Sequence, residues 1–205
     1  MIIGLDFDNT IVGYDLLFHK VALEQGLIAA DVPCSKVGVR DYLRGVDRED
    51  VWTEMQGHVY GERMAEAEIF PGVVEFLRRC RSVGVAVAIV SHKTRHPFIG
   101  PRHDLHAAAR GWVDRVLQED GPLVDPRRVY FELTKSSKIE RIARIGCDYF
   151  IDDLPEILRA PAFPSQTRGV LFDPQANHTG ESDIDAFDSW HSIREYMERR
   201  WTPAL

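Results

Sequence analysis

The sequence has no hydrophobic run long enough to cross a membrane. Its longest apolar run, residues 83–90, falls far short of the roughly 20 residues that a spanning helix needs, and it is typical of a buried strand. The first residues form no charged segment followed by an apolar one, as a secretory leader would. We therefore expect a cytoplasmic protein with no membrane partner.

Cysteine and net positive charge are also lacking. The three cysteines, Cys34, Cys80 and Cys147, form neither a CxxC pair nor an even framework, which favours reduced thiols and a cytoplasmic location. The formal net charge of −7 argues against a nucleic-acid backbone as partner. A small anionic substrate is compatible with this charge, because a metal and local cations can reverse the field at one site. The sequence leaves the oligomeric state open.

Repeats, low-complexity tracts and Gly/Ser linkers are absent, and 205 residues suffice for one substantial core with a small appended domain. Short apolar runs alternate with amphipathic stretches. We expect strands near 2–6, 85–90, 128–132, 148–151 and 168–172, and helices near 72–81, 104–117, 138–145 and 187–200. This alternation predicts an α/β fold, a doubly wound and mostly parallel Rossmann-like sheet with helices on both faces.

One segment departs from this alternation. Between residues 14 and 69 there is no convincing strand, and short helical patterns occupy 14–25, 41–44, 49–59 and 62–68. We predict that residues 1–13 and 70–205 form the α/β core domain and that residues 14–69 form a small helical cap. Such a cap would close over the site, exclude water and select the substrate.

Two acidic clusters lie far apart in the chain. Asp6 and Asp8 follow the first apolar run directly, and Asp152 and Asp153 follow a later one. Both clusters fall at the carboxyl ends of predicted strands, where open α/β sheets place their ligands. Carboxylates gathered there would repel one another unless a cation lay among them, and Mg²⁺ suits clustered oxygen ligands and phosphate. All four are therefore candidate metal ligands, and the pattern predicts a Mg²⁺-dependent phosphoryl-transfer enzyme.

The first cluster also offers catalytic groups. Side chains at i and i+2 of a strand point to the same side, so both carboxylates can face one pocket. Asp6 can attack phosphorus and form an aspartyl-phosphate, which splits the hydrolysis into two easier steps. Asp8 can protonate the leaving oxygen and later accept a proton from water. The Thr10 hydroxyl can hold Asp8, and Thr10 with the peptide N–H groups of the turn can bind phosphate oxygens.

The transferring phosphoryl group also requires a hydroxyl and a cation. Ser91 ends the predicted strand 85–90 and offers the hydroxyl, with His92 beside it as a further phosphate-binding candidate. Lys135 and Lys138 both offer the cation. Residues 137–140 fit a capping box with Ser137 as N-cap, which would place Lys138 in the first helical turn and leave Lys135 free in the loop. We therefore favour Lys135 as the phosphate-binding lysine.

In order, these motifs resemble those of the haloacid dehalogenase-like hydrolase superfamily. Asp6-x-Asp8-x-Thr10 resembles its nucleophile motif, Ser91 its hydroxyl, Lys135 its lysine, and Asp152-Asp153 its acidic metal motif. The resemblance spans about residues 1 to 160, although the interval from the lysine to the acidic motif is short. An insert after the first motif resembles the family's helical caps. The acid at position 8 resembles the phosphatase branch, which implies hydrolysis of a small phosphorylated metabolite with Mg²⁺ as cofactor.

Other functions fit the same residues. A phosphotransferase or phosphomutase would use the same chemistry with an acceptor in place of water. A non-catalytic regulatory module would need the acidic cluster but neither the acid nor the cap. The histidines of residues 92–106 and the neighbouring basic residues suggest a zinc site, a basic loop that meets the substrate, or a solvated loop. The identity of the substrate cannot be read from these residues.

Overall fold

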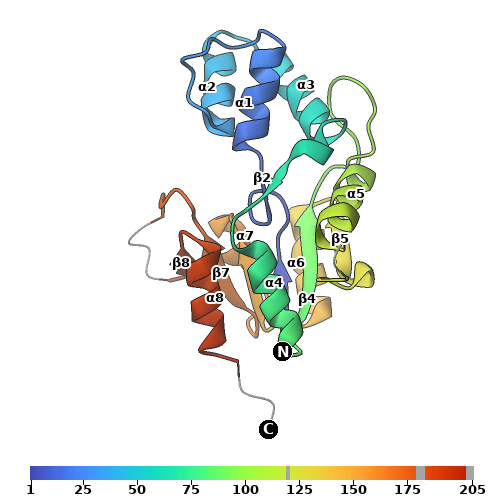
Figure 1. Cartoon of the computed structure of the whole chain (residues 1–205), viewed down its shortest axis with the longest axis vertical. Coiled ribbons are helices and arrows are strands. Elements are labelled where there is room, and N and C mark those ends of the chain that lie inside the picture. Colours follow the sequence, from blue (N-terminus) through green and yellow to red (C-terminus); the bar gives the residue numbers. More distant parts are fainter. Residues whose placement is uncertain (119–120, 179–182, 202–205) are drawn as a thin grey trace.

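The computed structural model describes residues 1–118, 121–178 and 183–201 (Figure 1). Its centre is a six-stranded sheet in which every neighbouring pair of strands is parallel, in the order β5-β4-β1-β6-β7-β8. The strands are β1 (Ile2–Leu5), β4 (Ala86–His92), β5 (Val129–Glu132), β6 (Tyr149–Asp152), β7 (Arg168–Phe172) and β8 (Asp185–Phe187). The expectation of a parallel α/β sheet is confirmed. The short strand β8 had no counterpart among the predicted strands.

Helices cover both faces of the sheet. One apolar cluster joins the sheet to α4 (Val73–Ser82), α5 (Leu105–Leu117) and α8 (Trp190–Glu198), and a second joins it to α6 (Lys135–Ile145) and α7 (Pro155–Leu158). A short 3₁₀ helix, η2 (Pro126–Arg128), precedes β5. Side chains of the central strand alternate between the two clusters, as in any strand buried on both faces.

Gly4, the third residue of the central strand β1, lies where there is no room for a side chain. Ile3 and Leu5 belong to the first cluster, and Gly4 between them faces the second. A Cβ atom at Gly4 would lie 2.4 Å from a ring carbon of Phe150. Glycine therefore lets the Phe150 ring pack directly on the backbone of β1, just before the first acidic motif.

We call residues 14–69 the insert. Its helices lie beyond the edge of the sheet at which β1 and β4 end (Figure 1). They are α1 (Asp15–Glu24), α2 (Lys36–Gly45), α3 (Glu49–Tyr60) and η1 (Met64–Glu66). The two connections to the sheet lie side by side, because β2 (Val12–Gly13) pairs antiparallel with β3 (Glu68–Ile69). This short strand β3 lies in a segment for which we expected none. The division into a core and a cap domain stays a prediction.

The insert is anchored to the core by α5. The indole nitrogen of Trp112 donates to the carbonyl of Ala67 over 2.8 Å, and Arg115 donates to the carbonyl of Ala65 over 2.6 Å. Phe18 and Trp52 of the insert belong to the same apolar cluster as the first face of the sheet. The helices of the insert are thus held by continuous packing on one side.

Two predicted helix starts are wrong. Helix α6 begins at Lys135, because Thr134 is its N-cap and accepts from the backbone N–H of Ser137 over 3.1 Å. Helix α8 begins at Trp190, because residues 185–187 pair with β7 as a strand. Across the described ranges, no helix is both long enough and apolar enough to pass through a membrane.

Candidate active site

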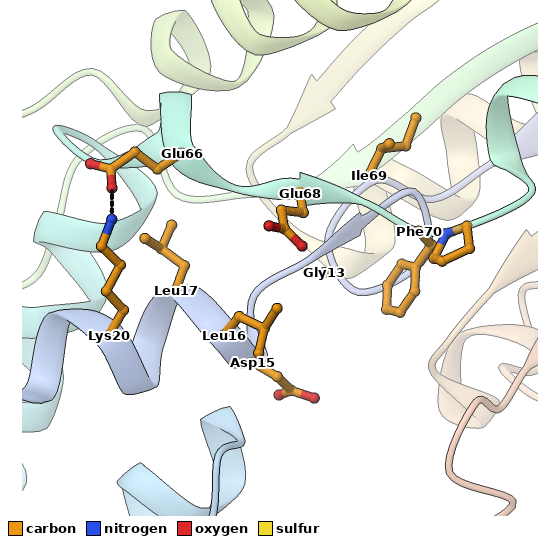
Figure 2. A pocket seen from close by; sticks show the side chains of 10 residues that line it. Gly13, Asp15, Leu16, Leu17, Lys20, Glu66, Glu68, Ile69 and Phe70 are labelled. Carbon is orange, nitrogen blue, oxygen red and sulfur yellow. Dashed lines mark hydrogen bonds and ion pairs between the residues drawn. The ribbon is translucent and has the colours of Figure 1, made fainter. Parts of the chain in front are cut away.

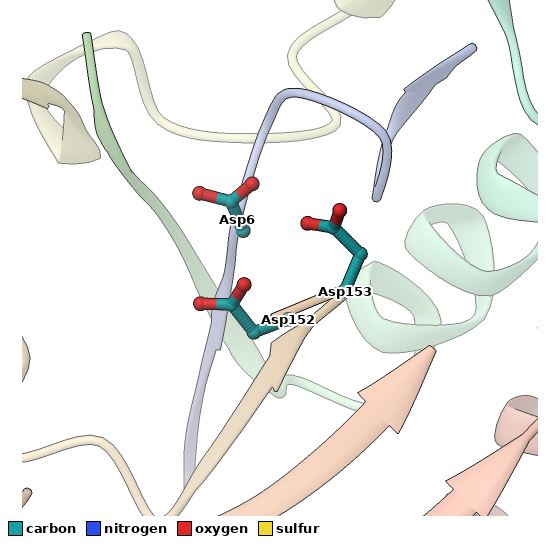
Figure 3. A group of neighbouring side chains, drawn as sticks. All are labelled: Asp6, Asp152 and Asp153. Carbon is teal, nitrogen blue, oxygen red and sulfur yellow. The ribbon is translucent and has the colours of Figure 1, made fainter. Parts of the chain in front are cut away.

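Three carboxylates converge where β1 and β6 end. Asp6 follows β1, and Asp152 and Asp153 lie at the end of β6, so the parallel pairing of these two strands brings the carboxylates together (Figure 3). One oxygen of each lies within 4.8 Å of the others. Among the described residues, no other group of three or more metal-binding side chains gathers in this way, and the histidines of residues 92–106 do not. Asp6 of the first acidic cluster therefore meets both acids of the second, as predicted.

The three carboxylates suit a divalent cation. Burial raises the pKa of Asp152 and of Asp153, and the charge of Asp6 raises both further. Buried carboxylates so close together are unfavourable as anions unless positive charge compensates them. Oxygen-only donors of this kind match the preference of Mg²⁺. The residues present therefore fit a hard divalent ion held by Asp6, Asp152 and Asp153.

Part of the compensating charge comes from a buried lysine. The ammonium of Lys138 lies 2.6 Å from Oδ1 of Asp6 and 2.6 Å from Oδ2 of Asp152, and its side chain is fully buried. Burial alone would lower the pKa of Lys138, but Asp6 and Asp152 more than offset this and raise it. Lys138 therefore stays charged in direct contact with the first carboxylate.

The other candidate lysine lies elsewhere. Lys135 is the first residue of α6 and its exposed ammonium pairs with Glu156. The expectation that Lys135 stands in a loop beside the site is wrong, because the cap is Thr134 and not Ser137. Starting the helix three residues earlier places Lys138 about one turn into α6, close to β1. The true N-cap lies three residues before the expected one. For this reason Lys138, and not Lys135, lies at the site.

Asp8 points to a different set of partners. Its carboxylate accepts from the Tyr14 hydroxyl over 2.5 Å and lies 2.7 Å from the ammonium of Lys93. Both partners are buried. The side chain of Asp8 thus lies outside the group formed by the other three carboxylates, so the structure does not bring the four expected metal ligands together. Its position beside two donors suits a proton-transfer residue.

A tight turn carries the first motif from β1 toward the insert. The backbone N–H groups of Ile11 and Val12 both donate to the carbonyl of Phe7, and Asn9 adopts a positive φ of 58°. Asparagine is among the few residues that adopt this left-handed conformation readily. Thr10 was expected to hold Asp8, but its hydroxyl lies 3.3 Å from Oδ1 of Asp153 instead. Thr10 therefore links the first acidic motif to the second.

The predicted phosphate-binding strand end is close by. Ser91 and His92 end β4, which pairs with β1 on the side opposite β6. Ser91 is buried, and His92 is half-buried. Burial lowers the pKa of His92 and the charge of Lys138 lowers it further, which favours the neutral form of the ring. Because β4 pairs in parallel with β1, Ser91 lies at the same edge of the sheet as Asp6, as expected.

Two cavities flank this region. One of about 540 Å³ lies between α2 of the insert and the core, and its lining includes Asn9 and Asp153. The other, of about 370 Å³, lies beside the paired connections β2 and β3, where Lys20 and Glu66 form an ion pair at its edge (Figure 2). The described residues around this second cavity include none of the predicted site residues. The first cavity is the one that opens onto the acidic group.

Three functional candidates escaped the sequence analysis: Tyr14, Lys36 and Tyr60. Each lies in the insert, and Lys36 and Tyr60 reach the site only through tertiary packing. Tyr60 packs 4.5 Å from the ammonium of Lys93, measured to its ring centroid. Lys93 is one of the basic residues next to the histidines of residues 92–106, and no pattern in the sequence distinguished it from the others. Tyr14 carried the only local signal, since it follows the first motif by a few residues.

Comparison with known proteins bears on the fold. No family model matches the chain, and no curated protein matches it in sequence. Among solved structures, a HAD family hydrolase from Deinococcus radiodurans R1 with bound phosphate and sodium is similar at a TM-score of 0.57, with 18% identity over 98% of this chain and 97% of that one. A phosphoserine phosphohydrolase-like protein from Francisella tularensis is similar at a TM-score of 0.58, with 10% identity over 95% and 98%.

A third structure extends this series. A predicted phosphoglycolate phosphatase from Haemophilus somnus is similar at a TM-score of 0.54, with 15% identity over 96% of this chain and 97% of that one. All three cover nearly the whole length of both chains, so the insert takes part in each match. The identities are low and the likeness is therefore one of fold. The chain has the fold of the haloacid dehalogenase-like hydrolases.

Proposed function

We propose that this protein is a Mg²⁺-dependent phosphatase that hydrolyses a small phosphomonoester through an aspartyl-phosphate on Asp6. The observation that carries the proposal is the position of Asp6: its buried carboxylate touches the Lys138 ammonium and faces Asp152 and Asp153. The names of the similar structures, which include phosphatases and hydrolases, agree with this reaction class. Phosphoryl transfer needs positive charge beside the nucleophile and the phosphoryl oxygens, and the contact of Lys138 with Asp6 supports this role for Asp6.

The chain's own residues supply the groups that make and break bonds in both chemical steps. In the first, an oxygen of Asp6 forms a bond to phosphorus while the ester P–O bond breaks, and Asp8 gives its proton to the leaving oxygen. In the second, water attacks phosphorus, its proton passes to Asp8, and the bond between phosphorus and Asp6 breaks to release inorganic phosphate. Tyr14 and Lys93 hold Asp8 for both transfers.

Lys138, Ser91 and a bound metal ion would position the phosphoryl group. Lys138 neutralises charge on Asp6 and on the phosphoryl oxygens, and the Ser91 hydroxyl lies at the same sheet edge to donate to one of them. Asp6, Asp152 and Asp153 would hold Mg²⁺, which when bound screens the attacking carboxylate from the anionic substrate. We assign phosphate binding to Lys138 rather than Lys135, because only Lys138 contacts Asp6.

The test is phosphate release by wild type and by Asp6→Asn, measured with p-nitrophenyl phosphate and a phosphometabolite panel. Asparagine keeps the shape of aspartate but not its nucleophilicity, so the variant should lose several orders of magnitude in kcat. Asp148→Asn, which changes an acid at the opposite end of the sheet, is the matched control and should remain active. Near-normal turnover by Asp6→Asn would rule out the aspartyl-phosphate.

The same assay separates the alternatives. A phosphotransferase or mutase would move the phosphoryl group to an added alcohol or sugar with little free phosphate. A regulatory module would accumulate a long-lived phospho-aspartate without turnover. Rapid release of inorganic phosphate into water is the result that the proposal requires.

A further inference from the structure

A cavity of about 540 Å³ adjoins the acidic group and is the natural place for the leaving group of a substrate. It is walled by α2 of the insert on one side and by the turn after β1, the end of β6 and the loop after β7 on the other. Phe70, Phe172 and Leu154 provide apolar surface, and Asp153 of the acidic group is part of the lining. This volume falls within the range of ordinary small-molecule sites, toward the small end.

One charged group in this wall has no ionic partner. The ammonium of Lys36, the first residue of α2, lies 5.8 Å from the ring centre of Phe18 and 5.6 Å from that of Tyr60. Within the described part of the chain, no carboxylate pairs with it. Burial lowers the pKa of Lys36, but Tyr60, Asp8 and Asp153 more than offset this and raise it. Lys36 is therefore a charged, partly desolvated cation next to the site.

The neighbouring acids are already engaged. Asp15 accepts the backbone N–H of Lys36 over 2.8 Å, and Asp173 accepts the backbone N–H groups of Asn177 and His178 over 3.0 and 2.7 Å. Arg40, one turn along α2, also lines the cavity and pairs with the exposed Asp41 over 2.8 Å. The cavity thus offers one unpaired ammonium and a guanidinium whose present partner is solvent-exposed.

We propose that Lys36, assisted by Arg40, binds a carboxylate on the alcohol part of the substrate, so that the enzyme selects phosphomonoesters of small hydroxy acids. The ring centre of Tyr60 lies 5.6 Å from the ammonium of Lys36 and 4.5 Å from that of Lys93, which pairs with Asp8. Lys36 therefore lies on the side of the site where Asp8 would protonate the ester oxygen. A single anionic charge suits one unpaired ammonium, whereas a second phosphate would bring two charges against the walls formed by Asp15 and Asp173. This inference rests on the proposed phosphatase function of the same site.

The test measures binding without turnover. Two phosphonates are compared by calorimetry in the presence of Mg²⁺: 3-phosphonopropionate, which carries a carboxylate, and propylphosphonate, which lacks it. Wild type should bind the carboxylate-bearing ligand about tenfold or more tightly, as expected of a charge-assisted contact in a partly buried site. Lys36→Met keeps an unbranched side chain of similar length without the charge and should remove most of this preference. Lys36→Arg should restore part of it.

Arg44→Met provides the matched control. Arg44 is on the same helix, but its side chain pairs with the exposed Glu49 and is not part of the cavity wall. This variant should keep the wild-type preference. Circular dichroism and thermal unfolding of all variants show whether each is folded, and Lys36→Arg keeps the comparison valid if Lys36→Met is not.

The outcomes separate this inference from the proposed phosphatase function. Equal binding of both phosphonates by wild type, or equal weakening of both by Lys36→Met, would overturn the carboxylate assignment while phosphate release stands. Tighter binding of propane-1,3-bisphosphonate than of 3-phosphonopropionate would also overturn it. A Lys36-dependent preference in a protein that hydrolyses no phosphomonoester would instead overturn the phosphatase proposal alone.

Discussion

At the scale of single residues, the two acids of the first motif have different surroundings. Asp6 is buried against Lys138 and two further carboxylates, whereas Asp8 is held by a phenol and a second lysine. A carboxylate surrounded by charge of both signs suits nucleophilic attack at phosphorus, and one fixed by two donors suits proton transfer in a set direction. Tertiary contacts therefore give the two acids of this motif surroundings that suit different roles.

The proton-transfer role predicts a dependence on the leaving group. Asp8→Asn should slow hydrolysis of an alkyl phosphate about 10²- to 10⁴-fold, because its leaving alkoxide must be protonated. The same change should slow the first step with p-nitrophenyl phosphate much less, since nitrophenolate leaves without a proton. Single-turnover kinetics with both substrates measure this first step directly. Equal losses on the two esters would remove Asp8 from the acid role.

The two lysines of α6 predict opposite outcomes. Lys138→Ala should lower phosphate release by orders of magnitude, because it removes the cation in contact with Asp6 and leaves buried carboxylates unpaired. Lys135→Ala should stay nearly normal, because its exposed pair with Glu156 contributes little. Steady-state kinetics on both variants, with thermal unfolding as the check on folding, decide between them. Normal activity of Lys138→Ala would show that another cation serves the phosphoryl group.

These residues also show what the sequence could predict. The positions of Asp6, Asp152, Asp153 and Ser91 at one edge of the sheet were predictable, because each follows or ends a recognisable apolar run and parallel strands end at one edge. The lysine was not, because two candidate caps, Thr134 and Ser137, stand three residues apart and each favours a different lysine. Lys36 and Tyr60 carry no local signal, since only the packing of the insert brings them to the site.

At the scale of elements, the start of α6 decides which lysine faces the site. Thr134 accepts the backbone N–H of Ser137, while Ser137 itself shares only a hydroxyl contact of 2.9 Å with Thr134. Thr134→Ala should therefore lower the free energy of unfolding by about 1 kcal/mol, a typical value for a lost N-cap. Ser137→Ala should cost only a few tenths of a kcal/mol, as for other surface substitutions of this kind.

Denaturant unfolding of the two variants measures this difference. If Ser137→Ala proves the more destabilising variant, the helix starts where the capping box suggested, and the assignment of Lys138 falls with it. Two missed strands have a different cause. Strand β8 is three residues long and β3 only two, so neither is long enough to show the alternation that identifies a strand.

At the scale of the whole molecule, the insert and the sheet enclose the site between them. The paired connections β2 and β3 link the two, and α5 packs against the insert beside them. The sequence predicted helices in the insert because helical patterns interrupt an otherwise regular βα alternation there. It could not predict the contacts of α5, which join segments that are distant in the chain. The site consequently combines groups from the two central strands with groups from the insert.

Binding of a metal to this site predicts a change in the stability of the entire fold. The three carboxylates, two of them buried and that of Asp153 partly so, meet only in the folded chain, so Mg²⁺ should bind the folded state and not the unfolded one. At a concentration 100 times its dissociation constant, the ion should add about 2.7 kcal/mol to the free energy of unfolding. For a chain of this size that amounts to roughly 5–10 °C in the unfolding midpoint.

Scanning calorimetry of the metal-free protein with and without Mg²⁺ measures this shift, and Asp153→Asn tests where the ion binds. Loss of one of the three carboxylates should weaken binding and reduce the shift at the same Mg²⁺ concentration. Asp148→Asn, which changes an acid that accepts the backbone N–H of Ile2 at the far end of β1, should leave the Mg²⁺-dependent shift unchanged. An undiminished shift in Asp153→Asn would place the ion elsewhere, because removing a ligand of the true site cannot leave its affinity intact.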